Sequence, residues 1–305
     1  MPSAHVTRHP FHMLLQFSSN GVQTRSDMER KSLEPWFRQH VSTRVSSNDV
    51  AEIPSENEAL LVAAMNGSFR GVEAALKAGA DIDFYNLFSN VTKHPHVPAC
   101  PALHITCLLG HVDIVRLLLR KGAWVAHRDA ATSSALHRAV AKGSTEIVDL
   151  LVQHGATVDT QDVHKNTPLV VAVSYNHVDT VRRLIELGAR PDLDHCPLFK
   201  TLKEDAKNRA RVEESLKLVE EAKKTKLLRC CNPKCGKPGY RKTGTLKLCA
   251  GCKLTRYCSR DCQIQHWSVG HKKCCQYDVY TEETADIYRK MSLLTVLFQV
   301  HPSQV

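Results

Sequence analysis

The chain has 305 residues, enough for about two domains, and 43% of them are hydrophobic. No run of eighteen apolar residues occurs, which excludes a transmembrane helix, and the first twenty residues lack the cleavage pattern of a secretory signal. We therefore expect no membrane association and an intracellular protein of the cytoplasm and/or nucleus. The arginines that precede the first acidic residue, Asp27, leave a transit peptide open.

The net charge of +10 is unevenly distributed along the chain. Between Ala222 and Cys275, fourteen lysines and arginines stand against Asp261 alone, a formal +13, so the remainder is at −3. Nine of the twelve cysteines lie between residues 230 and 275. Clustered thiols in an intracellular chain indicate a metal site rather than disulfides, because reducing compartments keep thiols free.

Residues 1–56 are rich in Ser, Asn and Arg and show no sustained hydrophobic period. This composition predicts a mostly disordered N-terminal region, with a short helix around the stretch LEPWFRQHV.

Residues 57–194 repeat at an interval of 33. Leu103, Leu136 and Leu169 are each separated by 33 residues, and the Gly-Ala pairs that close the copies keep the same interval. An earlier copy, EALLVAAMNGSFRGVEAALKAGA, fits if ten residues are inserted within NLFSNVTKHPHVPAC. The region therefore holds about four copies.

Each copy predicts two helices and a turn. Thr167 can cap a first helix with Pro168 at its first position, and Ser134 can do the same one copy earlier. The glycine that closes each copy suits the left-handed residue that ends the second helix. The apolar face of one second helix would consist of Ile147, Val148, Leu150 and Leu151.

The period of 33 and the TPLH-like starts resemble ankyrin repeats. This resemblance implies an α-solenoid in which each copy packs against its neighbours, and a surface that binds a partner protein. It also favours a structural hydrogen bond between adjacent repeats for His104 and His137, and a core position for Cys107. Trp124 stays open between a partner anchor and packing against the neighbouring hairpin.

Residues 195–229 follow the repeats as a helical cap and linker. The stretch KTLKEDAKNRARVEESLKLVEEAKK predicts one charged helix that would give the last repeat a polar outer face.

The cysteine-rich segment, residues 230–275, has the composition of a metal-stabilised fold. It has too few aliphatic side chains to hold its shape by apolar burial. Cys249 with Cys252, and Cys258 with Cys262, are short pairs that can each supply two corners of a tetrahedral zinc site. Eight ligands would fill two sites, and spacing alone leaves the pairing open.

The order of a cysteine pair, CAGC, RYCSRDCQ, HW and HKKCC closely resembles the MYND zinc finger. Two neighbours remain as alternatives, Cys231 to Cys230 and Cys274 to Cys275, while His266 is expected at the surface rather than on a metal. The resemblance implies two interleaved zinc ions, one on Cys230, Cys235, Cys258 and Cys262 and the other on Cys249, Cys252, His271 and Cys275.

The same resemblance implies a site for a proline-rich peptide of the PxLxP kind. Trp267 would pack against a proline and Gln263 would bond to the peptide backbone. A packing role for Trp267 over the zinc site is the alternative. Ala250 stands where some peptide-binding members have serine, a departure that bears on affinity.

Residues 276–305 predict a C-terminal helix and tail. Ile287, Tyr288, Met291, Leu294 and Phe298 would share one helical face, packed back onto the chain's own domain.

Taken together, the sequence predicts a mainly α protein: an ankyrin-repeat α-solenoid followed by a small zinc-stabilised MYND finger. We expect a non-enzymatic adaptor or scaffold for protein–protein interaction, whose repeats keep their helical signal when zinc is removed. A nucleic-acid-associated protein that uses the basic segment is the alternative. A MYND-linked methyltransferase is disfavoured, because nothing in the chain resembles a SET domain.

Overall fold

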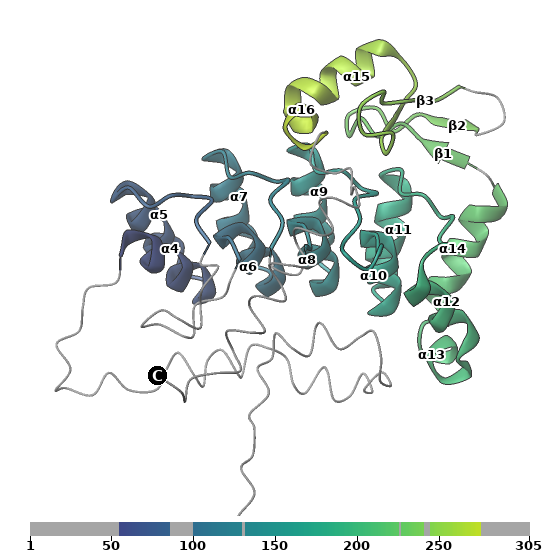
Figure 1. The fold of residues 1–305 in the computed structure, drawn as a ribbon, viewed down its shortest axis with the longest axis horizontal. Coiled ribbons are helices and arrows are strands. Elements are labelled where there is room, and N and C mark those ends of the chain that lie inside the picture. The colour runs from purple at the N-terminus through teal and green to yellow at the C-terminus, as the bar shows by residue number, and fades with distance from the viewer. Residues whose placement is uncertain (1–54, 86–99, 130–131, 226, 241–244, 276–305) are drawn as a thin grey trace, which may run out of the picture. The chain divides into compact units, whose positions relative to one another are not determined.

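The structure is a computed structural model (Figure 1), and it describes residues 55–85, 100–129, 132–225, 227–240 and 245–275. The predictions for residues 1–54, for the ten-residue insertion and for residues 276–305 lie outside the described residues. All described residues belong to one compact unit of the chain.

Helices in antiparallel pairs form the repeat region and stand next to one another in chain order (Figure 1). Each pair corresponds to one copy of the repeat. The pairs are α4 (Glu56–Met65) with α5 (Phe69–Lys77), α6 (Ala102–Leu109) with α7 (Val112–Arg120), α8 (Ala135–Lys142) with α9 (Thr145–Gln153), and α10 (Pro168–Ser174) with α11 (Val178–Glu186).

The helices begin where the sequence predicts caps. The Thr167 hydroxyl accepts a hydrogen bond from the Val170 amide, with Pro168 at the first helical position. Ser134 accepts one from the His137 amide, and the His137 ring accepts one from the Ser134 amide in return. Both predicted caps are confirmed, and each satisfies an amide that the helix itself leaves unpaired.

The core runs along the first helices of the pairs, which stack on one another. The three leucines that repeat at 33 residues, Leu103, Leu136 and Leu169, are at most 1% exposed. Cys107 is fully buried beside them, so its prediction as a core residue is confirmed. The predicted face of α9 is buried as well, and it consists of Ile147, Val148, Leu150 and Leu151.

Histidine side chains connect successive repeats. The Nε2 of His104 donates to the Ser133 carbonyl oxygen at 3.2 Å, and the Nε2 of His137 donates to that of Asn166 at 3.1 Å. Burial lowers the pKa of His104 to about 4, so this ring is neutral at physiological pH. The predicted structural role of both histidines is confirmed.

Trp124 packs between neighbouring copies. It is half-buried, its ring lies edge-on to the His127 ring with centroids 5.4 Å apart, and its amide donates to Asp83 of the preceding copy. The structure therefore favours packing over a partner anchor at this position.

Three helices, not one, follow the last repeat, so the prediction of a single charged helix is wrong. The break comes at Asp205, which adopts an extended backbone and caps the next helix through the Lys207 amide. The last of the three packs along α11, and its Leu216 and Val219 are buried there. The helices are α12 (Pro197–Glu204), α13 (Ala206–Arg211) and α14 (Glu213–Thr225). We call α4 to α14 the array.

A small unit of short elements, residues 227–275, completes the described chain, and we call it the finger. It contains two antiparallel hairpins, β1 with β2 and β3 with β4, followed by short helices (Figure 1). None of the described helices has the length and apolar character to cross a membrane. The elements are β1 (Leu227–Arg229), β2 (Pro238–Tyr240), β3 (Lys247–Leu248), β4 (Arg256–Tyr257), α15 (Arg260–His266), η3 (Trp267–His271) and α16 (Lys272–Cys274).

Candidate metal centre

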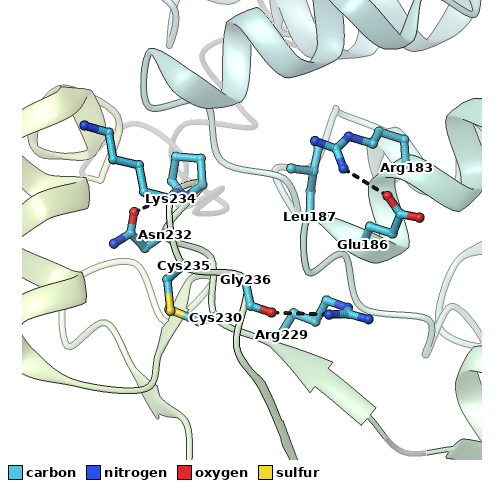
Figure 2. A pocket seen from close by; sticks show the side chains of 10 residues that line it. Arg183, Glu186, Leu187, Arg229, Cys230, Asn232, Lys234, Cys235 and Gly236 are labelled. Atoms are coloured by element: carbon cyan, nitrogen blue, oxygen red, sulfur yellow. Dashed lines mark hydrogen bonds and ion pairs between the residues drawn. The ribbon is translucent and has the colours of Figure 1, made fainter.

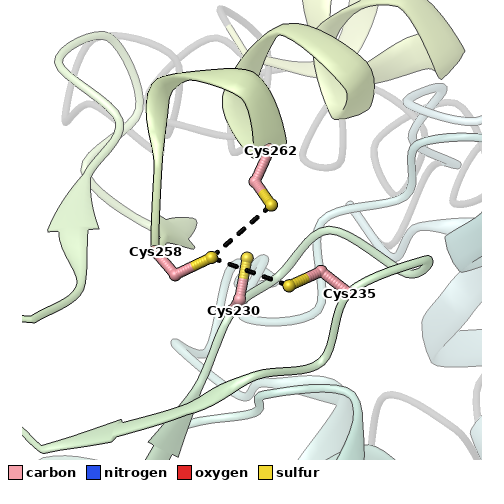
Figure 3. Close-up of side chains that lie close together, drawn as sticks. All are labelled: Cys230, Cys235, Cys258 and Cys262. Atoms are coloured by element: carbon pink, nitrogen blue, oxygen red, sulfur yellow. Dashed lines mark hydrogen bonds between the residues drawn. The ribbon is translucent and has the colours of Figure 1, made fainter.

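Four cysteine side chains converge between the first hairpin and α15 (Figure 3). Cys230 follows β1 and Cys235 lies in the turn before β2, while Cys258 follows β4 and Cys262 lies in the first turn of α15. The Cys258 sulfur lies 3.6 Å from that of Cys235 and 3.5 Å from that of Cys262.

A second group forms between the β3–β4 hairpin and the last helices. Cys249 and Cys252 come from the hairpin, while His271 is the last residue of η3 and Cys275 directly follows α16. The Cys249 and Cys275 sulfurs are 3.6 Å apart, as are the Cys252 sulfur and the Nε2 of His271.

Both groups have the dimensions of a tetrahedral zinc site. In each, the four candidate ligand atoms lie within 4.8 Å of one another. Zinc–sulfur bonds of about 2.3 Å place the sulfurs of a tetrahedron about 3.8 Å apart, close to the spacings found here. The donor sets, four thiols and three thiols with one imidazole, are those of structural zinc sites.

The chain visits the two groups alternately, in the interleaved arrangement that the resemblance implied. Cys230, and not Cys231, points into the first group, and Cys275, and not Cys274, into the second. Cys231 instead accepts a hydrogen bond from the Arg256 amide at 3.3 Å. None of the twelve cysteines, all in described residues, is disulfide-bonded.

Comparison with known families agrees with this geometry. The family model described as ankyrin repeats in three copies matches residues 60–162 and 103–195, and the model described as MYND finger matches residues 220–275. The chain carries ankyrin repeats and a MYND finger. Modules of both kinds are typically non-catalytic and serve protein interaction.

Two curated plant proteins resemble only a short part of the chain, within the MYND finger. Ubiquitin carboxyl-terminal hydrolase 17 of Arabidopsis thaliana is 51% identical over 39 residues, which are 13% of this chain and 5% of that protein. Ubiquitin C-terminal hydrolase 15 of Oryza sativa subsp. japonica is 61% identical over 28 residues, 9% of this chain and 3% of that protein. Because so little of either protein is covered, the likeness concerns the finger and not the hydrolase activity.

The thiols of the MYND finger differ in acidity. Burial raises the pKa of Cys230, with partial opposition from backbone hydrogen bonds. At Cys262, desolvation is outweighed by hydrogen bonds from Asn232, Ser259 and neighbouring thiols, so its pKa is lowered to about 7. Metal ligation requires thiolates, so filling the first group would release a proton from Cys230.

His266 lies in the interior, so the prediction of a surface histidine is wrong. It is 1% exposed and stacks on the His271 ring with centroids 5.0 Å apart. The Tyr257 hydroxyl lies 2.9 Å from its Nδ1. Burial lowers its pKa to about 3, which keeps it neutral beside the second group. No pattern in the sequence predicts this burial, since it depends on His266 standing where α15 continues directly into η3.

The two predicted peptide-binding residues, Trp267 and Gln263, each lie next to a member of the second group. Trp267 is 38% exposed, and its ring meets the His271 ring edge-on with centroids 5.8 Å apart. The side-chain amide nitrogen of Gln263, Nε2, lies 4.0 Å from the Cys249 sulfur. Trp267 therefore packs against a residue of the second group and is also partly exposed to solvent, while its contact with a peptide stays a prediction.

Sequence reasoning missed a polar hollow where the finger meets α11 (Figure 2). It has a volume of about 370 Å³ and is lined from the array by Arg183 and Glu186, which pair with each other, and from the finger by Arg229 and Lys234. Only the folded chain brings these residues together, since they come from separate modules.

Proposed function

We propose that the chain is an adaptor that joins two protein ligands. The ankyrin array binds one partner, and the MYND finger, folded around two zinc ions, binds an extended proline-rich peptide at the surface around Trp267. The proposed ligands are Cys230, Cys235, Cys258 and Cys262 for the first ion and Cys249, Cys252, His271 and Cys275 for the second.

A structural role for zinc is supported by the number of donors. Each group offers four protein ligand atoms, whereas catalytic zinc sites keep a coordination position open for water or substrate. A filled tetrahedron leaves no such position. The zinc would therefore stabilise the finger and hold its surface in shape rather than carry out a reaction.

The observation that carries the peptide proposal is the number of large apolar side chains that the finger leaves exposed. Among the described residues, four of the five exposed large hydrophobic side chains lie within 22 positions of one another in this small unit. Exposed apolar patches on soluble domains mark interaction sites. We call them the finger patch: Leu248 (53% exposed), Ile264 (56%), Trp267 (38%) and Val269 (37%).

The geometry next to the patch suits an extended ligand. β3 pairs with β4 alone within the described chain, and its two residues are exposed, so its other edge can pair with a peptide strand. Gln263 lies one position before Ile264 of the patch and is half-buried. Proline-rich segments are already extended, which lowers the entropy lost when they bind beside an aromatic ring.

The test is a binding titration of the zinc-loaded full chain with a fluorescent PxLxP peptide. We expect Trp267→Ala to weaken binding by at least about tenfold, because aromatic anchors in such sites contribute 2 kcal/mol or more. Trp124→Ala, which removes a tryptophan from the array, should leave the affinity unchanged. Both variants should retain the zinc content of the parent protein.

Two results would speak against the proposal. One is equal affinity of the parent protein and Trp267→Ala at equal zinc content. The other is equal binding of a peptide in which the prolines are replaced by alanine. A parallel affinity purification with the full chain and Trp267→Ala, read by mass spectrometry, would then identify partners that depend on the patch.

A further inference from the structure

The glycine turns that end the second helices of the repeats are alike in backbone but differ in exposure. Gly79, Gly122, Gly155 and Gly188 all adopt a left-handed φ between +95° and +103°. Gly79 and Gly122 are exposed, and a Cβ added at either would meet no atom within 4 Å. Gly155 and Gly188 are buried. The same turn is therefore open in the first two repeats and covered in the last two.

Backbone of the finger covers the two buried turns. A Cβ built on Gly155 would lie 2.5 Å from the Gly270 carbonyl carbon, and one on Gly270 would lie 2.2 Å from the His154 carbonyl oxygen. At Gly188 the nearest atom is the Arg229 carbonyl oxygen, at 3.1 Å. At Gly155 and Gly270, an alanine could be accommodated only if the two backbones moved apart.

A buried ionic network lies between the two contacts. Arg256 of the finger donates to the Gly188 carbonyl oxygen at 2.7 Å and reaches the Asp159 carboxylate at 3.4 Å. Asp159 and Arg256 are both about 5% exposed. Removing the Asp159 carboxylate would take away the acidic partner of the buried Arg256 guanidinium.

Arg190 of the array joins the same network by bonding to Asp159 and to the finger. Its amide donates to Asp159, and its guanidinium donates to the carbonyl oxygens of Lys253 and Leu254 at 2.6 and 3.1 Å. Both carbonyls belong to the loop between Cys252 and β4. Each module thus supplies an arginine that bonds to backbone oxygen of the other.

We infer that the turns after α9 and α11 are a docking site for the chain's own finger, and that zinc loading of the finger controls whether this site is covered. Arg256 lies between Cys252 and Cys258, which belong to the two metal groups, so its position depends on both. Gly270 directly precedes His271 of the second group. The loaded finger then stays docked against the array through Gly270 and Arg256, while the array keeps its own apolar core. This inference depends on zinc loading but not on peptide binding.

The test compares Gly155→Ala with Gly122→Ala in the zinc-loaded full chain. Both glycines have nearly the same φ, +97° and +95°, so the intrinsic backbone strain of alanine is matched. Only at Gly155 does the added methyl group meet the finger. We expect Gly155→Ala to speed zinc release to a chelator by about tenfold or more and to raise amide exchange at residues 186–192. Gly122→Ala should change neither.

A second measurement uses the unaltered chain, in case Gly155→Ala does not fold. Chelation of zinc should raise amide exchange at residues 155–163 and 186–192, the turns that the finger covers, and leave the open turn at residues 121–127 as it was. The inference is overturned if all three turns respond equally, if none responds, or if the two alanine variants release zinc at the same rate.

Discussion

Leu151 of the array and Leu248 of the finger are leucines in opposite environments. Leu151 is fully buried in α9, whereas Leu248 in β3 is 53% exposed. The buried cluster of the finger contains cysteines around Tyr257 in place of aliphatic side chains. The array is held together by apolar burial, whereas the buried cluster of the finger consists largely of candidate metal ligands. If zinc stabilises the finger as we propose, the finger does not need to bury its apolar side chains to fold.

Removing zinc should have the largest effect, because it should unfold the finger without unfolding the array. Structural zinc contributes about 10–16 kcal/mol of apparent binding free energy in small finger peptides, which is comparable to the whole stability of a domain. We expect Cys258→Ser, or chelation, to unfold residues 227–275 while far-UV circular dichroism keeps most of its helical signal. Metal analysis and NMR amide dispersion would measure the two effects.

Cys231→Ser is the matched control for Cys258→Ser. Cys231 is as buried as its neighbour Cys230 but accepts a backbone hydrogen bond, which a serine hydroxyl can also accept. This variant should keep the full zinc content. Loss of zinc from Cys231→Ser but not from Cys258→Ser would overturn the ligand assignment.

Truncating Leu151 and Leu248 tests the same difference through a smaller change in the unfolding free energy. Leu151→Ala should destabilise the array by about 2–5 kcal/mol, because it leaves a cavity among side chains that cannot fully collapse. Leu248→Ala should change the unfolding free energy of the array by less than about 0.5 kcal/mol, since exposed positions contribute little. Urea denaturation followed by circular dichroism measures both. Equal destabilisation of the array by the two variants would contradict the claim that Leu151 stabilises the array and Leu248 does not.

The sequence was sufficient where one local pattern determines the structure. The interval of 33 residues located the helix pairs, and the caps at Ser134 and Thr167 followed from side chains three residues from the amides they satisfy. The two metal groups followed from a motif with little freedom in its spacing. In each case the informative residues are close in sequence or repeat regularly.

What could not be predicted depends on contacts between distant segments. Asp159 and Arg256 are 97 residues apart, and neither belongs to a pattern that names the other. The break at Asp205 was missed because a continuous charged stretch fits one helix as well as three. The position of His266 directly before Trp267 does not reveal its burial, which stacking on His271 and the Tyr257 hydroxyl make favourable.

Two helix caps of equal chemistry give the smallest and most specific test. The Thr167 hydroxyl caps α10 in the array, and the Ser259 hydroxyl caps α15 through the Cys262 amide at 3.2 Å. Replacing either with alanine should cost about 1 kcal/mol. For Thr167→Ala the loss should be seen in the urea midpoint of the array. For Ser259→Ala it should be seen as zinc affinity weakened about fivefold, because folding of small zinc-stabilised domains is coupled to metal binding. If Ser259→Ala shifted the array midpoint and left zinc affinity unchanged, the division between apolar and metal-based stability would be wrong.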